Sequence, residues 1–126
     1  MAFNVYHNPT TVTIGSTSIT GVQSIAVSED MAEIHASGDS DTHESVARYG
    51  TARTSGTITL VDPVSAEAAS GTTGTLSAVL TDAKGATNKT LTIANCSIGP
   101  WNATVPRDAA STCTLTFIAE AAASLA

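Results

Sequence analysis

Apolar and polar residues alternate with a period of two along most of the chain, as in strands that bury one face. Val, Ile and Thr, which are enriched in strands, dominate these segments. The Gly15-Ser16 pair fits a two-residue hairpin turn that begins with glycine. Strands are expected over residues 12–14, 17–19, 22–37, 51–61, 75–82, 89–98 and 112–120. Turn signals between them predict a mainly β fold, a small sandwich or barrel of about seven strands.

Two of the expected strands contain an irregularity. The Glu29-Asp30 pair interrupts the alternation within 22–37, so we expect a bulge or a tight turn there. Gly56 lies inside the strand 51–61 and indicates a bend or a close approach of the backbone to another group.

One segment has the signals of a helix instead. Asp62 is a suitable N-cap, Pro63 fits the first helical position, and Glu67 favours the positive end of the helix dipole. Gly71 is placed to end the helix. These signals predict one short helix, Pro63–Ser70.

The length of 126 residues predicts a single domain, 1–126. Three segments do not follow the strand pattern: an N-terminal arm over 1–9, a loop over 38–50 and a loose tail over 121–126. The loop is bracketed by Gly38 and Gly50. Long loops in small domains are often functional or form interfaces, so this one is a candidate contact.

The charges are concentrated. Six of the eleven acidic residues lie between Glu29 and Glu44, a stretch without Lys or Arg. The chain has a net charge of −6, and its five basic residues are scattered. Tight binding to nucleic acid needs clustered Lys and Arg, so this composition argues against it. A strand with one sign of charge suggests a surface that repels an anion.

The sequence has no clear pattern of a metal or catalytic site. Asp39, Asp41, His43 and Glu44 could in principle bind a divalent cation, but they lack the spacing of an EF-hand. The alternative is a solvated polar loop. The histidines and serines match no hydrolase motif, so we expect neither an enzyme nor a cofactor nor a metal.

The chain begins without a secretory signal and has no apolar run long enough to cross a membrane. We therefore expect folding in a cytoplasm and no membrane partner. Cys96 and Cys113 are then expected to be reduced, although their place on adjacent predicted strands leaves a bridge open.

The segment from Ile19 to Pro63, ITGVQSIAVSEDMAEIHASGDSDTHESVARYGTARTSGTITLVDP, resembles the front half of phage tail tube proteins. Those proteins pair two curved strands around a long loop, return through a strand with glycine and then place a short helix. The later strands are also similar. The resemblance rests on this layout, because the family has no invariant motif.

The resemblance implies a structural protein of the virion tail, made in the cytoplasm of a bacterial host. It implies hexameric rings that stack into a tube, with the curved strands joined around an inner barrel through which DNA passes without specific binding. The partners would be the chain itself and tail proteins such as a terminator or sheath. A head–tail connector or tail-end protein of the same fold is an alternative.

The resemblance and the charge pattern together suggest site residues. Glu29 and Glu33 are expected to point into the lumen, and a bulge would put Asp30 there in place of Glu29. The residues expected to contact a neighbouring subunit are Asp39, Asp41, His43, Glu44, Arg48 and Tyr49. Two other classes remain open: an Ig-like capsid decoration or surface-binding module, and a small carbohydrate-acting or esterase-like enzyme.

Overall fold

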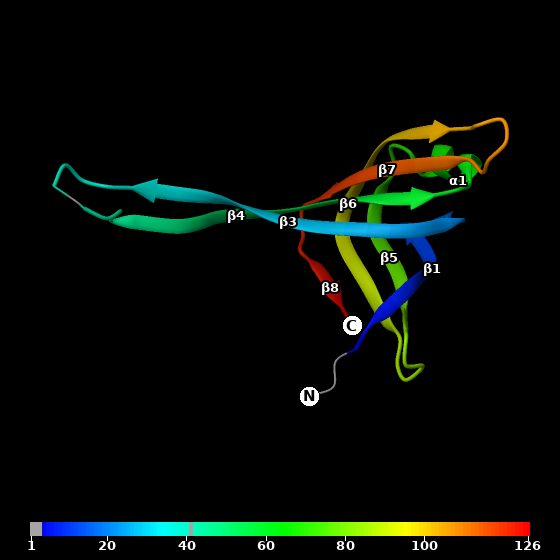
Figure 1. Ribbon diagram of the computed structural model, residues 1–126, viewed down its shortest axis with the longest axis horizontal. Helices are drawn as coiled ribbons and strands as arrows, with labels where there is room; N and C mark the ends of the chain where they lie inside the picture. Colours follow the sequence, from blue (N-terminus) through cyan, green and yellow to red (C-terminus); the bar gives the residue numbers. More distant parts are fainter. Residues whose placement is uncertain (1–3, 41) are drawn as a thin grey trace.

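The computed structural model describes residues 4–40 and 42–126, and in that part the fold is mainly β with one short helix, as expected. The eight strands and the helix are β1 (Tyr6–Ile14), β2 (Thr17–Ile19), β3 (Val22–Ala36), β4 (Val46–Leu60), α1 (Pro63–Ala69), β5 (Thr73–Asp82), β6 (Lys89–Thr104), β7 (Thr112–Ala119) and β8 (Ala123–Leu125). Figure 1 shows their arrangement.

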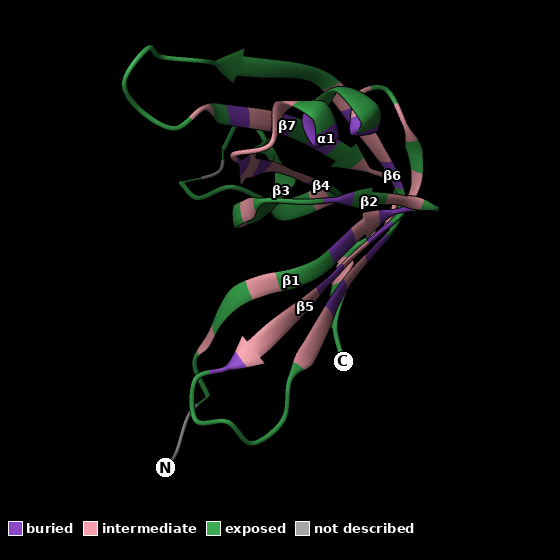
Figure 2. Ribbon diagram, turned by 90° about the vertical axis from the view of Figure 1, so that its right-hand side faces the viewer, coloured by how far each residue is buried: buried purple, intermediate pink, exposed green. Residues whose placement is uncertain are grey.

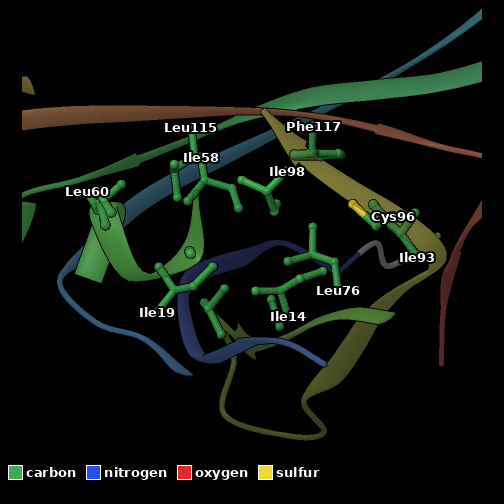
Figure 3. Close-up of a cluster of buried hydrophobic side chains, with 14 of the residues drawn as sticks. Ile14, Ile19, Ile58, Leu60, Leu76, Ile93, Cys96, Ile98, Leu115 and Phe117 are labelled. Atoms are coloured by element: carbon green, nitrogen blue, oxygen red, sulfur yellow. The ribbon is translucent and has the colours of Figure 1, made fainter. Parts of the chain in front are cut away.

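All strands belong to one antiparallel sheet, in the order β2-β1-β5-β6-β7-β4-β3, with β8 paired to β6. The sheet bends along the long strand β6, so that β1 and β5 diverge from the layer of β3 and β4 (Figure 2). The hydrophobic core lies inside this bend (Figure 3). Its largest fully buried aliphatic side chains are Ile14, Ile58, Leu60, Leu76, Ile93 and Leu115.

The helix forms where the cap signals predicted it. The Asp62 carboxylate accepts hydrogen bonds from the backbone N–H groups of Val64, at 3.1 Å, and Ser65, at 3.4 Å. The helix ends at Ala69 with Ser70 as its C-cap, and Gly71 follows with φ of +74°. None of the described helical residues forms a segment long and apolar enough to span a membrane.

The last part of the segment expected as the loop 38–50, residues 46–50, belongs to a strand. β4 begins at Val46, and the register continues from Ala36 opposite Val46 to Glu33 opposite Tyr49. Arg48 and Tyr49 are therefore strand residues. Val46–Tyr49 has no clear alternation of apolar and polar residues, and pairing with β3 makes it a strand. Asp41 lies outside the described residues.

Both expected loose ends are partly strand. β1 starts at Tyr6 and pairs with β5, and register shifts around Thr10 accommodate Asn8 and Thr11, each with φ of 50°. At the C-terminal end, β8 pairs with residues 91–93 of β6. Three residues on an exposed strand edge carry too little pattern to be predicted as a strand.

The cysteines do not lie side by side. Cys96 is opposite Ala119 on β7, whereas Cys113 is opposite Ala103 on β6, seven positions farther along that strand. At about 3.3 Å per residue this is a separation of roughly 20 Å, far beyond the ~7 Å that a disulfide spans. Both thiols are buried and free.

Candidate assembly surfaces

β3 and β4 continue well beyond the body of the molecule (Figure 1). We call residues 29–53 the projecting hairpin. β7 accompanies β4 only from Thr54 to Leu60, so the part of β4 before Thr54 has β3 as its single strand neighbour among the described residues. Most described residues of the projecting hairpin are exposed on both faces. A two-stranded ribbon with no buried face contributes little to the core, so another role must account for it.

The sheet register divides the acidic residues between two faces. Thr54 and Ile58 are buried, which defines the core face of β4. Glu29 is opposite Thr54 and therefore on the core face, where its Oε1 accepts a hydrogen bond from the N–H of Ala123 at 3.4 Å. Asp30, opposite Arg53, lies on the other face.

The bulge expected at Glu29-Asp30 is absent, because these two residues pair with consecutive residues of β4. The register shifts lie elsewhere, between Val22 and Ser24 and between Met31 and Glu33. In the second shift the extra residue is on β4, so side chains along β3 keep alternating.

Glu33, His35 and Glu44 come together near the end of the projecting hairpin. His35 Nδ1 lies 2.7 Å from Glu44 Oε2, and His35 Nε2 lies 3.3 Å from Glu33 Oε2. The hydrogen bond with Glu44, and then that with Glu33, raises the pKa of His35. These contacts tie the connection between β3 and β4 to the core face of β3. They also show that Glu33 and His35 share a face, as residues two apart in a strand do.

The other residues expected at the subunit contact do not join the group of Glu33, His35 and Glu44. Asp39 is exposed in the connection. His43 Nδ1 lies 2.8 Å from the carbonyl oxygen of Thr42. Arg48 is opposite Ile34, and Tyr49 is opposite Glu33. Over residues 4–40 and 42–126, no group of three or more His, Cys, Asp or Glu side chains is arranged to hold a metal ion.

The projecting hairpin also exposes apolar side chains, which the sequence analysis did not single out. Met31 and Ile34 are each 50% exposed, and Tyr49 is 69% exposed. Val46, next to the connection, is 37% exposed. Large apolar groups on a projecting ribbon are typical of a contact surface. Met31 and Ile34 lie on opposite faces of β3, and each shares its face with acidic residues, so the local sequence pattern shows no single apolar face.

The face of β3, β4 and β7 that points away from the core is lined mainly by hydroxyl groups. We call it the hydroxyl face; the register places on it Ser24, Ala26, Ser28, Ser55, Thr57, Thr59, Thr114, Thr116 and one exposed apolar residue, Ile118. Asp30 and Arg53 extend it with one charge of each sign. The face is therefore polar and close to neutral.

Two strand edges beside the hydroxyl face remain open in the described part of the chain. β3 ends the sheet order and pairs only with β4. β6 pairs with β5 over residues 89–97 and with β7 up to Thr104, so its last residues have a strand on one side only. Open edges present unpaired N–H and C=O groups that favour pairing with another chain.

No protein-family model and no curated protein sequence matches the chain. Its fold, however, matches solved structures. A chain in the sheath–tube complex of the PVC extracellular contractile injection system, in the extended state, is 14% identical with a TM-score of 0.63, covering 99% of this chain and 91% of that one. A chain of the anti-feeding prophage cap, which terminates a tube, is 13% identical with a TM-score of 0.61, covering 100% and 94%. At this identity the likeness establishes a shared fold over nearly the whole chain.

Proposed function

We propose that this chain is a structural subunit of a tail-type tube, in which hexameric rings stack into a conduit that DNA passes without specific binding. The observation that carries the proposal is the pair of open strand edges on either side of the hydroxyl face. The fold shared with injection-system proteins and the tail-tube resemblance of the sequence support it. The count of six comes from that resemblance.

The direction of the strands favours closure into a ring. β6, β7, β4 and β3 are antiparallel neighbours, so β6 and β3 at the two edges run in opposite directions. When copies are related by rotation, β3 of one copy then meets β6 of the next in antiparallel fashion. Such head-to-tail pairing forms a closed barrel if the rotation closes, and it satisfies both open edges.

In this arrangement the hydroxyl face lines the channel, because α1 and the core occupy the other side of the sheet. Asp30 then faces the lumen, whereas Glu29 and Glu33 face away from it. The lining is nearly neutral, since Arg53 lies opposite Asp30. A conduit of this kind offers DNA few cations to bind, and the net charge of −6 per copy opposes adhesion.

Negative-stain microscopy of the purified chain at high concentration tests the proposal. Six-fold rings or tubes are expected. A protein that stays monomeric or trimeric in sedimentation experiments at the same concentration would overturn it and favour a decoration module.

Proline in the open edge gives a matched test. Successive N–H groups of a strand point to opposite sides, so one of the variants Ala26→Pro and Val27→Pro removes an N–H facing β4, and the other removes one facing outward. The variant that keeps the wild-type melting temperature better identifies the outward N–H. That variant is expected to fold and not to form rings. If it forms normal rings, the edges do not pair.

A terminal ring is a second candidate, favoured by the match with the tube-terminating cap. A cap subunit forms rings that do not lengthen into tubes. The distribution of particle lengths in the same micrographs separates the two roles.

A further inference from the structure

Trp101 is the only tryptophan of the chain, and it lies on the part of β6 that β5 leaves open. Its side chain is 40% exposed. Trp101 is opposite the fully buried Leu115 of β7, so it projects on the core face of the sheet. This orientation depends on the register shift between Ile98 and Trp101, where two residues of β6 oppose one of β7. A bulge of this kind re-aims a side chain, and without it Trp101 would project on the hydroxyl face.

An apolar groove lies at the other end of the same sheet, beside the open edge of β3. It has a volume of about 470 Å³, and its apolar lining comprises Tyr6, Ile25, Val27, Leu80, Leu91 and Leu125. Val27 is 36% exposed and Leu125 is 62% exposed. Ile25 is opposite the buried Ile58, so Ile25 and Val27 lie on the core face of β3. The groove therefore opens on the same side of the sheet as Trp101.

Trp101 and the groove stand at the two ends of one row of side chains. The register places in this row, across β6, β7, β4 and β3, the residues Trp101, Leu115, Ile58 and Ile25. Leu115 and Ile58 are fully buried and separate the two ends (Figure 3). At about 4.8 Å between neighbouring strands, the backbones of Trp101 and Ile25 are roughly 14 Å apart. The Trp101 side chain cannot fill the groove of its own chain, so an occupant comes from another molecule.

We propose that Trp101 of one copy inserts into this groove of the next copy in the ring and anchors the contact between them. The inference rests on the proposed tube function, which it deepens by naming the anchor residue and the site that receives it. When β6 of one copy pairs with β3 of the next, the two sheets become continuous, and so do their faces. Trp101 then lies beside Ile25 and Val27 of the neighbour, on the core face, whatever the stagger between the two strands.

The chemistry of the groove suits an indole ring. The ring would cover the apolar surface that Val27 and Leu125 leave exposed. Gln23 and Asn8 also line the groove, and their amide oxygens can accept the hydrogen bond that a buried indole N–H requires. Open strand edges alone would accept a strand of any sequence. The insertion of Trp101 makes the pairing selective for β6 of a second copy.

The fluorescence of the single tryptophan tests the contact in the unmodified protein. Monomers and rings are separated by size, and the emission spectrum and the quenching by acrylamide are measured in each fraction. In rings the emission is expected to shift to shorter wavelength and the quenching to fall, because the indole leaves water. Rings with the emission and quenching of the monomer would overturn the inference and leave the tube proposal standing. If micrographs show no rings, the tube proposal fails, and the inference fails with it.

A double-mutant cycle tests whether the groove is the site that receives Trp101. Trp101→Ser is expected to raise the concentration needed for ring formation roughly tenfold or more, because tryptophans are frequent hot spots of interfaces. Leu125→Ser should raise it as well. Since the two side chains touch across the junction, the double variant should lose less than the product of the two single effects.

Trp101→Ser combined with Ile34→Ser is the matched control. Ile34 is 50% exposed on the projecting hairpin, nine residues from Ile25 along β3 and remote from the groove, so the two effects should multiply. Multiplication in both pairs would contradict insertion into the groove. Wild-type melting temperatures, measured below the concentration of ring formation, show that the variants keep the fold.

Discussion

Gly56 is the position where the sheet depends most plainly on the absence of a side chain. A Cβ there would overlap the ring of Phe117 and the carbonyl oxygen of Ala26. The sequence indicated a bend or a close approach at this glycine, and the structure identifies the approaching group. Phe117 is one of the largest buried side chains, so it has no free space into which to move.

Gly56→Ala is therefore expected to destabilise the fold by about 1–3 kcal/mol, the usual cost of overpacking a core. Thermal or urea unfolding of the purified variant measures it. Gly85→Ala is not a suitable control, because Gly85 has φ of +73° and is strained by any side chain. Gly99→Ala is better, since its Cβ would meet mainly the hydroxyl of Thr116 on the sheet surface. If Gly56→Ala lowers the free energy of unfolding no more than Gly99→Ala does, the ring of Phe117 can move aside.

His35 gives the projecting hairpin a dependence on pH. Its contacts with Glu44 and Glu33 raise its pKa, so they stabilise the end of the hairpin fully below the unfolded value of about 6.5. The stabilisation is lost as the pH rises through the raised folded pKa. An NMR titration of His35 is expected to show a lower pKa in Glu44→Gln. Glu67→Gln, on the helix, serves as the control, and an unchanged His35 pKa in Glu44→Gln would contradict the assignment.

At the scale of elements, alternation and capping signals predicted which segments are strands and which is a helix, but not where two strands end. The limit of β4 illustrates the reason. The segment Val46–Tyr49 is short, has no clear alternation and lies between a polar connection and Gly50. It is a strand because residues of β3 pair with it. Pairing over long sequence separations is absent from a local pattern.

In the candidate site, too, the local sequence predicted some features and not others. The acidic stretch and the contact role of this region were suggested by composition, whereas the faces were not. The period of two groups Glu29 with Glu33 and Asp30 with Ile34, but it does not say which group shares a side with the core. That assignment needed β7, which buries Thr54 opposite Glu29.

The helix cap links α1 to the connection between β2 and β3. The Asp62 carboxylate accepts a hydrogen bond from the Thr20 hydroxyl at 2.6 Å in addition to its bonds with the first turn. Asp62→Ala is expected to lower the melting temperature by several degrees, whereas Asp62→Asn retains most of the cap. The Thr20 bond and the backbone bond from Ser65 lower the pKa of Asp62. Its contribution is therefore present above about pH 3.9 and is lost as the pH falls through the lowered folded value.

Melting curves at pH 7 and at acidic pH measure this effect. Glu67→Ala, an exposed helix residue, should leave the melting temperature nearly unchanged. If Asp62→Ala melts like Glu67→Ala at pH 7, the cap does not hold the helix to the sheet.

At the scale of the whole molecule, the question is which face of the sheet lines the proposed channel. The hydroxyl face is open over β3, β4 and β7, whereas the core face is covered by the bent sheet and α1. Lysine placed on the lining should bind DNA phosphates and release counterions, so that retention falls steeply as salt rises. Lysine on the outside of a tube should not hold DNA within it.

Three variants distinguish the faces in assembled particles loaded with short DNA. Ser28→Lys together with Asp30→Lys changes the hydroxyl face and is expected to make tubes retain DNA at low salt and release it at high salt. Glu67→Lys on the helix is the control, and tubes of this variant should retain no DNA. Glu29→Lys together with Glu33→Lys tests the core face, because the acidic sequence pattern predicts that these two residues point into the lumen. If only tubes of the Glu29→Lys and Glu33→Lys variant retain DNA, the proposed orientation of the subunit is wrong. The side of the sheet that carries α1 would then face the channel.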